Sequence, residues 1–521
     1  MQKNKILWVD DEIELLRSHI IFLNEKGYEV STVTNGEDAI SEVKNGQFDL
    51  IFLDEMMPGL GGLETLGQIK EINSNIPVVM VTKSEEESLM NDAIGGKITD
   101  YLIKPVVPSQ VLMVCKKILE SKKISVEYVA KDYLNDFNDI TRLLMYQPTF
   151  SEWIDIYIKL VNWDIELDTH PEIDLRQSLV DQKKESNKEF SKFVEKNYQN
   201  WINNSDDKPL LTVDITDKYV LPHVKKKTGP VFYFVIDCLR LDQWLVMEKH
   251  LTNLFNIQKD YYYSILPTAT PYARNALFAG LYPSEIEKHY PDLWDSMSDD
   301  ENSMNKYEKE LLQELLNRRK ISLSNELKYL KIIDPEVGRS FEQNVLSHKN
   351  SHFVAVVVNF LDMIAHGRSD SQILKEIAPD ESAYRSLTNS WFQHSYLLNA
   401  FKAIATMPNA KIIVTTDHGS IRALRGAKVL GDREALPNLR FKYGRNLKVD
   451  DKHAVFVKNA SDFKLPKHGL TISYIIAKED YYFVYPTEYH KYLSHYKDSF
   501  QHGGISLEEM ILPVITLESR A

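Results

Sequence analysis

Several short apolar runs in this sequence end directly in aspartate. They are KILWVD at residues 5–10, DLIFLD at 49–54, FYFVID at 232–237 and KIIVTTD at 411–417. Uninterrupted apolar runs of this length are typical of strands that are buried on both faces, as in parallel sheets. A carboxylate at the end of such a strand is costly to bury unless a cation or hydrogen-bond donors compensate it. We therefore expect α/β sheets whose polar edges bind charged partners.

The length and composition restrict the class of protein. A chain of 521 residues is too long for one ordinary core, so two or three domains are expected. It is 43% apolar and 26% charged, and it contains no run of 18 apolar residues and no signal-peptide core after Met1. These features predict a cytoplasmic protein without a membrane span. The two cysteines indicate no disulfide framework, and the net charge of −13 argues against a surface built wholly for nucleic acid.

The periodicity of apolar residues changes twice along the chain. In residues 1–120, five short apolar strands alternate with amphipathic helical stretches, which predicts a parallel sheet with helices on both faces. Residues 121–205 show only helical spacing of tryptophan and leucine, and we expect a bundle of three or four helices. A polar stretch near 203–209 then precedes a larger α/β region, 206–521. The chain is thus predicted to be an α/β multidomain protein with an all-α helical bundle as linker.

Polar residues in the first region fall at the ends of predicted neighbouring strands. Carboxylates gather there, since Asp10 and Asp11 follow the first strand and Asp54 ends the third. Thr82 and Lys104 end two further strands. Adjacent carboxylates repel one another and need a hard divalent cation such as Mg²⁺. With the cation in place, one carboxylate can attack a phosphoryl group whose oxygens the hydroxyl and the lysine stabilise.

This set, in this order and spacing, resembles the receiver domain of two-component response regulators. The resemblance implies a (βα)5 fold, Asp54 as the phosphate acceptor, and Asp10, Asp11 and Asp54 around Mg²⁺. It also implies Thr82 and Lys104 as the switch pair, with Tyr101 at the aromatic switch position. The alternative is a receiver-like domain that no longer takes phosphate.

A second set of metal-ligand residue types lies in loops of the C-terminal region. Asp237 ends a strand, and Asp417 and His418 follow another; Asp362 and His366 are four residues apart, and His502 lies in a glycine-flanked loop. Mixed aspartate and histidine ligands suit Zn²⁺ or Mn²⁺ better than Ca²⁺. A lone histidine is more often structural, which is the reading for the remaining candidates, His289, His352, His453, His468 and His495.

In sequence order, the second set resembles the alkaline phosphatase superfamily and, within it, the PglZ domain. The resemblance implies an alkaline-phosphatase-like α/β sandwich with two metal ions. One ion would be held by Asp362, His366 and His502. The other would be held by Asp237, Asp417 and His418, with Thr270 as nucleophile and further ligand. Thr270 is favoured over Thr268 because the family's nucleophile precedes the glycine of a GLYP motif by ten residues, and that glycine is Gly280.

The chemistry implied is phosphoryl transfer to the Thr270 hydroxyl followed by hydrolysis, with two ions about 4 Å apart clamping the phosphate. Arg274 and Asn275, on the same predicted helix, are candidates for hydrogen bonds to the phosphate oxygens. The N-terminus of that helix would also favour the bound anion. The alternative is a domain that keeps metal only to hold its fold.

Residues 421–448 carry eight basic against two acidic residues, together with Phe441 and Tyr443. Such a stretch can steer a polyanion and stack bases, which favours nucleotide or oligonucleotide phosphodiesters as substrates. The alternative is a solvated surface loop.

The whole combination resembles the PorX-like response regulators of type IX secretion. That resemblance implies a sensor histidine kinase as phosphate donor, a homodimer on phosphorylation, and contacts with an extracytoplasmic-function (ECF) sigma factor or with secretion-motor proteins. A regulator that acts only through protein partners, with a structural metal site, remains the main alternative. Direct DNA binding is a weaker one, because the sequence shows no recognition helix.

Overall fold

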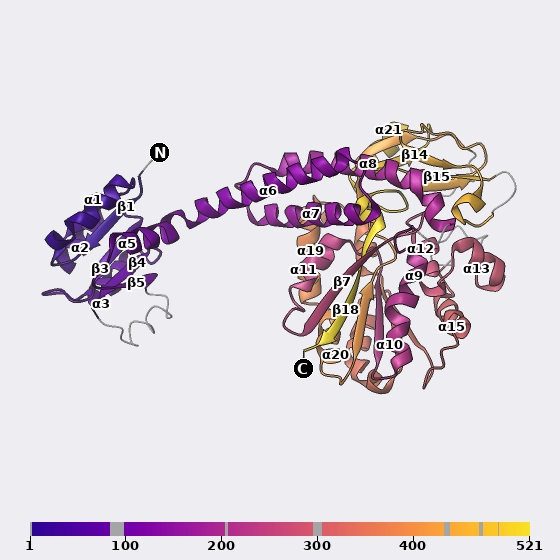
Figure 1. Ribbon diagram of the computed structural model, residues 1–521, viewed down its shortest axis with the longest axis horizontal. Coiled ribbons are helices and arrows are strands. Elements are labelled where there is room, and N and C mark those ends of the chain that lie inside the picture. Colours follow the sequence, from indigo (N-terminus) through magenta and orange to yellow (C-terminus); the bar gives the residue numbers. More distant parts are fainter. Residues whose placement is uncertain are drawn as a thin grey trace. The chain divides into compact units, whose positions relative to one another are not determined.

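The computed structural model describes residues 3–83, 98–203, 207–294, 305–431, 438–467, 472–487 and 489–520. The chain divides into two compact units, Met1–Asp132 and Tyr133–Ala521, and each is described by itself. Both are drawn in Figure 1 with the element labels used below.

The N-terminal unit contains one five-stranded parallel sheet in the order β2-β1-β3-β4-β5. The strands are β1 (Lys5–Val9), β2 (Glu29–Val33), β3 (Leu50–Asp54), β4 (Val78–Thr82) and β5 (Asp100–Ile103). All five coincide with predicted apolar runs. Every residue of β3 and β4 is buried, because helices cover both faces of a parallel sheet.

Two apolar cores lie on the two faces of this sheet. Leu7, Ile51 and Met80 face one core, and Ile6, Phe52 and Val79 face the other, as the alternation of a β-strand requires. The helical elements around them are η1 (Ile13–Leu16), α1 (Arg17–Glu25), α2 (Gly36–Asn45), α3 (Gly62–Ile72), α5 (Pro108–Cys115) and η2 (Lys116–Glu120). The predicted (βα)5 architecture is confirmed.

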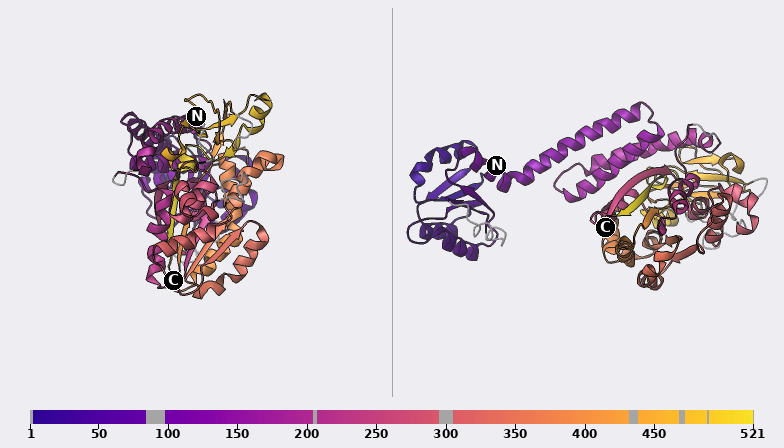
Figure 2. Two further views of the ribbon diagram at one scale, coloured as in Figure 1. Left: turned by 90° about the vertical axis from the view of Figure 1, so that its right-hand side faces the viewer. Right: turned by 60° about the horizontal axis from the view of Figure 1, so that its bottom comes forward.

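The predicted linker forms three long helices, α6 (Ser121–Met145), α7 (Phe150–Thr169) and α8 (Arg176–Asn203). Thr149 caps α7 in a reciprocal capping box with Glu152, which satisfies backbone donors at the start of that helix. Buried aromatic residues join α7 to α8, including Trp153 packed edge-on against Phe190 with ring centroids 5.3 Å apart. Helices α7 and α8 run side by side within the second unit (Figures 1 and 2).

The second unit is built on a six-stranded mixed sheet in the order β7-β18-β10-β6-β9-β8. Its strands are β6 (Val231–Ile236), β7 (Phe255–Tyr263), β8 (Lys328–Ile332), β9 (Phe353–Val358), β10 (Lys411–Thr415) and β18 (Ile511–Ser519). Strands β8, β9, β6 and β10 are parallel, whereas β18, yellow in Figure 1, is antiparallel to both of its neighbours. The carboxyl ends of β6, β9 and β10 therefore lie at one edge.

Helices cover both faces of the large sheet. Phe234, Val356 and Val414 face an apolar core shared with helices α11, α16, α19 and α20, whereas Tyr233 contacts Phe278 and Thr216 on the opposite face. The helices of the first face are α11 (Leu241–Glu248), α16 (Pro335–Asn344), α19 (Glu381–Gln393) and α20 (Tyr396–Ala405). Elements of the other face include α9 (Thr212–Ile215), η3 (Thr216–Val220), α10 (Leu221–Lys226), α12 (Thr270–Ala279) and α15 (Glu308–Arg318). The predicted α/β sandwich is confirmed.

Smaller sheets complete the second unit. Their strands are β11 (Ile421–Ala423), β12 (Arg425–Lys428), β13 (Phe441–Gly444), β14 (Ala454–Val457), β15 (Ser473–Ala477), β16 (Tyr481–Val484) and β17 (Ser499–Gln501). The other helical elements are α13 (Pro283–His289), η4 (Pro291–Leu293), η5 (Val345–Asn350), α17 (Phe360–Asp370), α18 (Gln372–Ile377), η6 (Ala460–Phe463), α21 (Tyr489–Tyr496) and α22 (Leu507–Met510). Among the described helices, none combines the length and the apolar character that a bilayer span requires.

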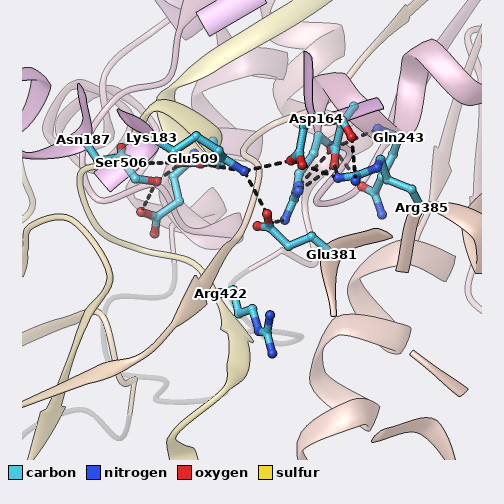
Figure 3. A network of polar contacts seen from close by, with 12 residues as sticks. Asp164, Lys183, Asn187, Gln243, Glu381, Arg385, Arg422, Ser506 and Glu509 are labelled. Carbon is cyan, nitrogen blue, oxygen red and sulfur yellow. Dashed lines mark hydrogen bonds and ion pairs between the residues drawn. The ribbon is translucent and has the colours of Figure 1, made fainter. Parts of the chain in front are cut away.

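A buried ionic network fixes α7 and α8 to the rest of the second unit (Figure 3). Arg385 of α19 contacts Asp168 and Asp164 of α7 at 2.6 and 3.1 Å and Asp242 of α11 at 3.2 Å. Lys183 of α8 contacts Asp164 at 2.9 Å and Glu381 at 2.8 Å. The neighbouring cations lower the pKa of the Glu381 carboxyl against the effect of burial.

We expect Arg385→Met to destabilise the second unit by about 3–5 kcal/mol, because three buried or half-buried carboxylates lose a shared cation. The control is Arg319→Met, whose side chain is 47% exposed and pairs with Asp217 on the surface, where about 1 kcal/mol or less is expected. Denaturant unfolding followed by tryptophan fluorescence measures both, since every tryptophan except Trp8 lies in this unit. Equal, small losses in the two variants would contradict a stabilising network.

Candidate functional site

The structure gathers the polar residues predicted for the N-terminal unit at one edge of its sheet. Asp10 follows β1, Asp54 ends β3, and the ligand oxygens of Asp10, Asp11 and Asp54 lie within 4.8 Å of one another. The Lys104 ammonium lies 2.9 Å from both Asp10 and Asp54. Burial raises the pKa of Asp54, and the negative charges of Asp10 and Asp11 add to this, while Lys104 opposes it. An all-oxygen donor set of this kind fits Mg²⁺.

The remaining receiver residues surround this acidic group. Thr82 ends β4, and its hydroxyl donates to the carboxylate of Glu55, the residue after Asp54. Tyr101 is half-buried on β5 and packs against the core that Leu53 and Met80 share. Gly62 is required by space, because a Cβ there would lie 2.2 Å from the carbonyl oxygen of Asp54.

In the second unit, the predicted ligands form two groups at the carboxyl edge of the large sheet. Asp237 directly follows β6, Asp417 and His418 follow β10, and Thr270 is the first residue of α12. Asp362 lies in the first turn of α17, His366 lies one turn later, and His502 follows β17. The carboxyl ends of parallel strands β6, β9 and β10, the starts of α12 and α17, and the end of β17 thus converge on one place.

The first group consists of Asp362, His366 and His502. The Nε2 atom of His366 lies 3.3 Å from a carboxylate oxygen of Asp362 and 3.1 Å from Nε2 of His502. His366 has a side chain that is 45% exposed, whereas His502 is buried. This group can therefore be reached from solvent on the His366 side.

The second group consists of Asp237, Asp417 and His418, all buried. The Nε2 atom of His418 lies 3.7 Å from Oδ1 of Asp237 and 3.8 Å from Oδ2 of Asp417. Among the described residues, neither of these carboxylate oxygens accepts a hydrogen bond. Buried acceptors without donors are costly, so an ion between them fits the site.

The histidine tautomers support the same conclusion. Nδ1 of His418 lies 3.1 Å from the carbonyl oxygen of Gly419, and Nδ1 of His502 lies 3.3 Å from that of Thr268. Because a carbonyl oxygen only accepts, each Nδ1 carries the proton and each Nε2 keeps its lone pair for a metal ion. The two rings stack with centroids 4.1 Å apart, which makes the two ligand groups neighbours.

Burial controls the charge of these ligands. It raises the pKa of Asp237 to about 8 and that of Asp417 to about 6, against the lowering effect of Arg274. It also lowers the pKa of His418, so that this ring is neutral. In contrast, the nearby histidines lower the pKa of Asp362 in spite of its burial.

Thr270 is oriented toward the second group. Its hydroxyl lies 3.0 Å from Nε2 of His418. The hydroxyl of Thr268 is engaged elsewhere, donating to the carbonyl oxygen of Gly504 at 2.8 Å and accepting from the amide of Gly503 at 3.1 Å. The geometry therefore favours Thr270 over Thr268, as the spacing to Gly280 does.

Arg274 has contacts other than those predicted. Its guanidinium is buried between Asp237 and Glu308, 2.6 Å from a carboxylate oxygen of each, and it lies 3.8 Å from Asp417. These contacts make it a counterion of the metal-ligand carboxylates, so the predicted contact with substrate stays a prediction. Asn275 is buried as well and donates to the carbonyl oxygen of Pro271.

Glu308 is a residue that the sequence analysis missed. It lies at the start of α15, is buried, and accepts from Arg274 and from the Tyr329 hydroxyl. In the sequence, Glu308 is one of several glutamates on an amphipathic helix, and no local pattern distinguishes it from the exposed glutamates.

The described parts of the basic stretch, 421–431 and 438–448, contribute strands β11, β12 and β13 to the small sheets. Arg440 is fully buried and paired with Glu509, and Lys442 is buried too. Arg422 and Arg425 form ion pairs with acids of neighbouring segments, and Phe441 packs edge-on against Tyr272. For the described residues the interpretation as a solvated loop is therefore wrong, and the charges of Arg422, Arg425 and Arg440 are paired within the unit.

The histidines predicted to be structural lie outside the ligand groups of the described chain. His352 accepts from the amide of Ser324 and donates to the carbonyl oxygen of Val224, which is a structural role. His453 packs against Tyr481, with ring centroids 4.3 Å apart. His468 falls outside the described residues.

Three family models match successive parts of the chain. The response regulator receiver domain matches residues 6–116, the PorX response regulator linker domain matches 123–202, and the BREX system PglZ alkaline phosphatase-like domain matches 215–517. This is the PorX-like architecture expected from the motifs.

Curated relatives resemble part of the chain. The transcriptional regulatory protein ResD of Bacillus subtilis is 35% identical over 22% of this chain and 48% of its own length. The alkaline phosphatase synthesis transcriptional regulatory protein PhoP of the same organism is 34% identical over 23% of this chain and 50% of its own length. The chain thus spans about half the length of these relatives.

Among solved structures, a CheY-like response regulator receiver domain protein from Methanospirillum hungatei is 25% identical over 24% of this chain and 99% of that chain, with a TM-score of 0.23. The PglZ match covers more than half of the sequence. The chain therefore belongs to the PglZ family of alkaline phosphatase-like proteins, in which this member also carries a response-regulator receiver and a PorX-type linker.

Proposed function

We propose that this protein is a response regulator, phosphorylated on Asp54, whose output is a zinc-dependent phosphodiesterase. The observation that carries the catalytic part is the position of Thr270. Its hydroxyl lies 3.0 Å from the lone-pair nitrogen of His418, beside two adjoining groups of metal-ligand residues. A nucleophile in that position is what phosphoryl transfer through a covalent intermediate requires.

The ligand residues suit Zn²⁺, with Mn²⁺ as a second possibility. Asp362, His366 and His502 would hold one ion, and Asp237, Asp417 and His418 would hold the other with the Thr270 oxygen. When bound, the ions would supply charge to acidify a hydroxyl and to neutralise phosphate oxygens. Mg²⁺ would bind Asp10, Asp11 and Asp54 in the receiver.

Residues of the chain would perform the positioning. The N-terminus of α12 places Thr270 at the positive end of a helix, which favours an anionic phosphate next to the nucleophile. Arg274 would keep Asp237 and Asp417 ionised for metal binding, since its positive charge opposes the effect of burial on their pKa values. His418 stays neutral, and its Nδ1 proton is held by Gly419.

A polyanionic substrate, such as a nucleotide or short oligonucleotide diester, is favoured by a second feature. A cavity of about 500 Å³ lies between α8 and the small sheets. Its described lining holds six basic residues against three acidic ones, together with Tyr481. The basic residues are Lys184, Lys188, Lys192, Arg425, Lys452 and Lys478. Because His453 and Arg425 already pack on the Tyr481 ring, the cavity favours such a substrate through charge, and its basic residues suit the phosphates of a nucleic-acid backbone.

The regulatory part of the proposal rests on the receiver and the linker. A sensor histidine kinase would donate the phosphate, and phosphorylation would produce a homodimer. The PorX-type linker supports a role in regulating type IX secretion, through an ECF sigma factor or secretion-motor proteins. The alternative remains a regulator that acts only through such partners and holds metal for structure.

We expect Thr270→Val to reduce hydrolysis of a nitrophenyl phosphodiester by roughly 10³-fold or more, because the attacking oxygen is lost. Zinc binding should persist, since the other ligands remain. Thr252→Val is the control, because Thr252 is exposed and its hydroxyl donates to the carbonyl oxygen of Lys249 in the turn that follows α11. A wild-type protein that binds two zinc ions and cleaves neither diesters, monoesters nor oligonucleotides would refute the catalytic proposal and leave the regulatory alternative.

We expect Asp54→Asn to abolish labelling by a small phosphoryl donor and the accompanying dimerisation, because the acceptor carboxylate is gone. Intact-mass spectrometry and sedimentation velocity with and without the donor measure the two effects. Asp49→Asn serves as the control, because Asp49 is an exposed aspartate just before the same strand. Donor-dependent labelling that survives in Asp54→Asn would contradict the assignment.

A further inference from the structure

Helix α8 of the linker is hydrogen-bonded to the segment that carries His502. This segment, residues 502–509, is called the strap below. Asn187 of α8 donates from its amide nitrogen to the carboxylate of Glu508 at 3.0 Å. Its amide oxygen accepts from the backbone amide of Leu507 at 2.8 Å. One turn further along α8, the hydroxyl of Ser191 lies 3.3 Å from the carbonyl oxygen of Ile505 and shares its one proton with the carbonyl oxygen of Asn187 at 2.8 Å, so Asn187 makes the stronger contact with the strap.

The strap is stiff between these contacts and His502. The side chain of Glu509 accepts from the amide of Gly504 at 2.8 Å and from the hydroxyl of Ser506 at 2.8 Å. The same carboxylate pairs with the buried guanidinium of Arg440. Through Glu509 the α8 end of the strap is hydrogen-bonded to Gly504, two residues from His502.

The strap also touches the loop of the second ligand group. The amide of Gly419 donates to the backbone oxygen of Glu509 at 3.3 Å. A Cβ on Gly419 would lie 2.0 Å from the backbone oxygen of Glu508, so the two segments are as close as their backbones allow. Since Gly419 follows His418, the strap fixes one histidine from each ligand group.

Ion pairs of Lys183 hold the face of α8 that contacts the strap. Lys183, one turn before Asn187, lies 2.8 Å from Glu381 and 2.9 Å from Asp164, and 4.0 Å from Glu508 (Figure 3). Asn187 is itself only 6% exposed. Lys183, Asn187 and Ser191 are spaced by four residues and so present one face of the helix to the strap.

We propose that Asn187 and Ser191 are positioning residues of the two-metal centre, and that linker helix α8 sets the metal affinity by holding the strap. The proposal rests on the metal-dependent function proposed above. Partners hydrogen-bonded directly to metal ligands commonly change affinity by about 10–100-fold when they are replaced, and because Asn187 acts through the strap, the lower end of that range applies to it. The linker is thus part of the centre's supporting structure and a route by which linker movement reaches the ligands.

The test compares two leucine variants of buried amides on α8 in the full-length protein. Asn187→Leu removes both bonds to the strap, whereas Gln182→Leu removes a bond to the carbonyl oxygen of Phe137 on α6. Zinc affinity is measured by competition with a chromogenic chelator, and thermal unfolding of the metal-free proteins is followed in parallel. We expect zinc affinity to fall about tenfold or more in Asn187→Leu and to stay at the wild-type value in Gln182→Leu.

Unchanged affinity in both variants would overturn the proposal, as would equal losses in both, which would indicate general loosening of α8. If Asn187→Leu does not fold, Ser191→Ala is judged against Gln182→Leu by the same criterion. A wild-type protein that binds zinc but hydrolyses no ester would refute the proposed function alone, because the affinity comparison still decides the role of Asn187. A wild-type protein that binds no zinc would refute both.

Discussion

Carboxylates buried at the carboxyl ends of parallel strands are the constraint on which this structure depends. Asp10 and Asp54 in one unit, and Asp237 and Asp417 in the other, are removed from water by the same strands that form the cores. Each set has a basic side chain beside it, Lys104 in the first and Arg274 in the second. These cations offset part of the burial cost, and in the second unit Oδ1 of Asp237 and Oδ2 of Asp417 accept no hydrogen bond from the described residues, so an ion fits beside them.

Much of the fold could be predicted because its central strands are apolar on both faces. Strands β1, β3 and β4 of the receiver and β6, β9, β10 and β18 coincide with such runs, whereas the receiver's edge strands β2 and β5 are more exposed. Strand β7 was missed because its sequence, FNIQKDYYY, mixes polar and aromatic residues, as suits a strand at the edge of the sheet beside β18. The small strands β11–β13 were missed because arginine and lysine occupy them, and these residues are stabilised by partners far away in the sequence.

In the candidate site, too, some residues could be predicted from the sequence and others could not. Its ligand residues follow apolar strands or share a helix turn, so local sequence identifies them. Their supports are joined by long-range contacts that no local pattern encodes, such as Arg274 with Glu308, 34 residues away, and Asn187 with Glu508, 321 residues away. The candidate ligand residues could be predicted from one sequence, whereas the partners of the buried charges could be identified only from the three-dimensional structure.

The ionic network of α7 and α8 determines which truncated fragments of this protein keep their buried charges paired. The PglZ match begins at residue 215, after both helices have ended. A fragment that starts there would keep Arg385, Glu381 and Glu508 but lose Asp164, Asp168, Lys183 and Asn187, which neutralise or hydrogen-bond them. Buried charges would then face water or remain uncompensated. The unit that similarity delimits is therefore smaller than the unit that packs, because α7 and α8 of the linker belong to the same compact body as the enzyme-like domain.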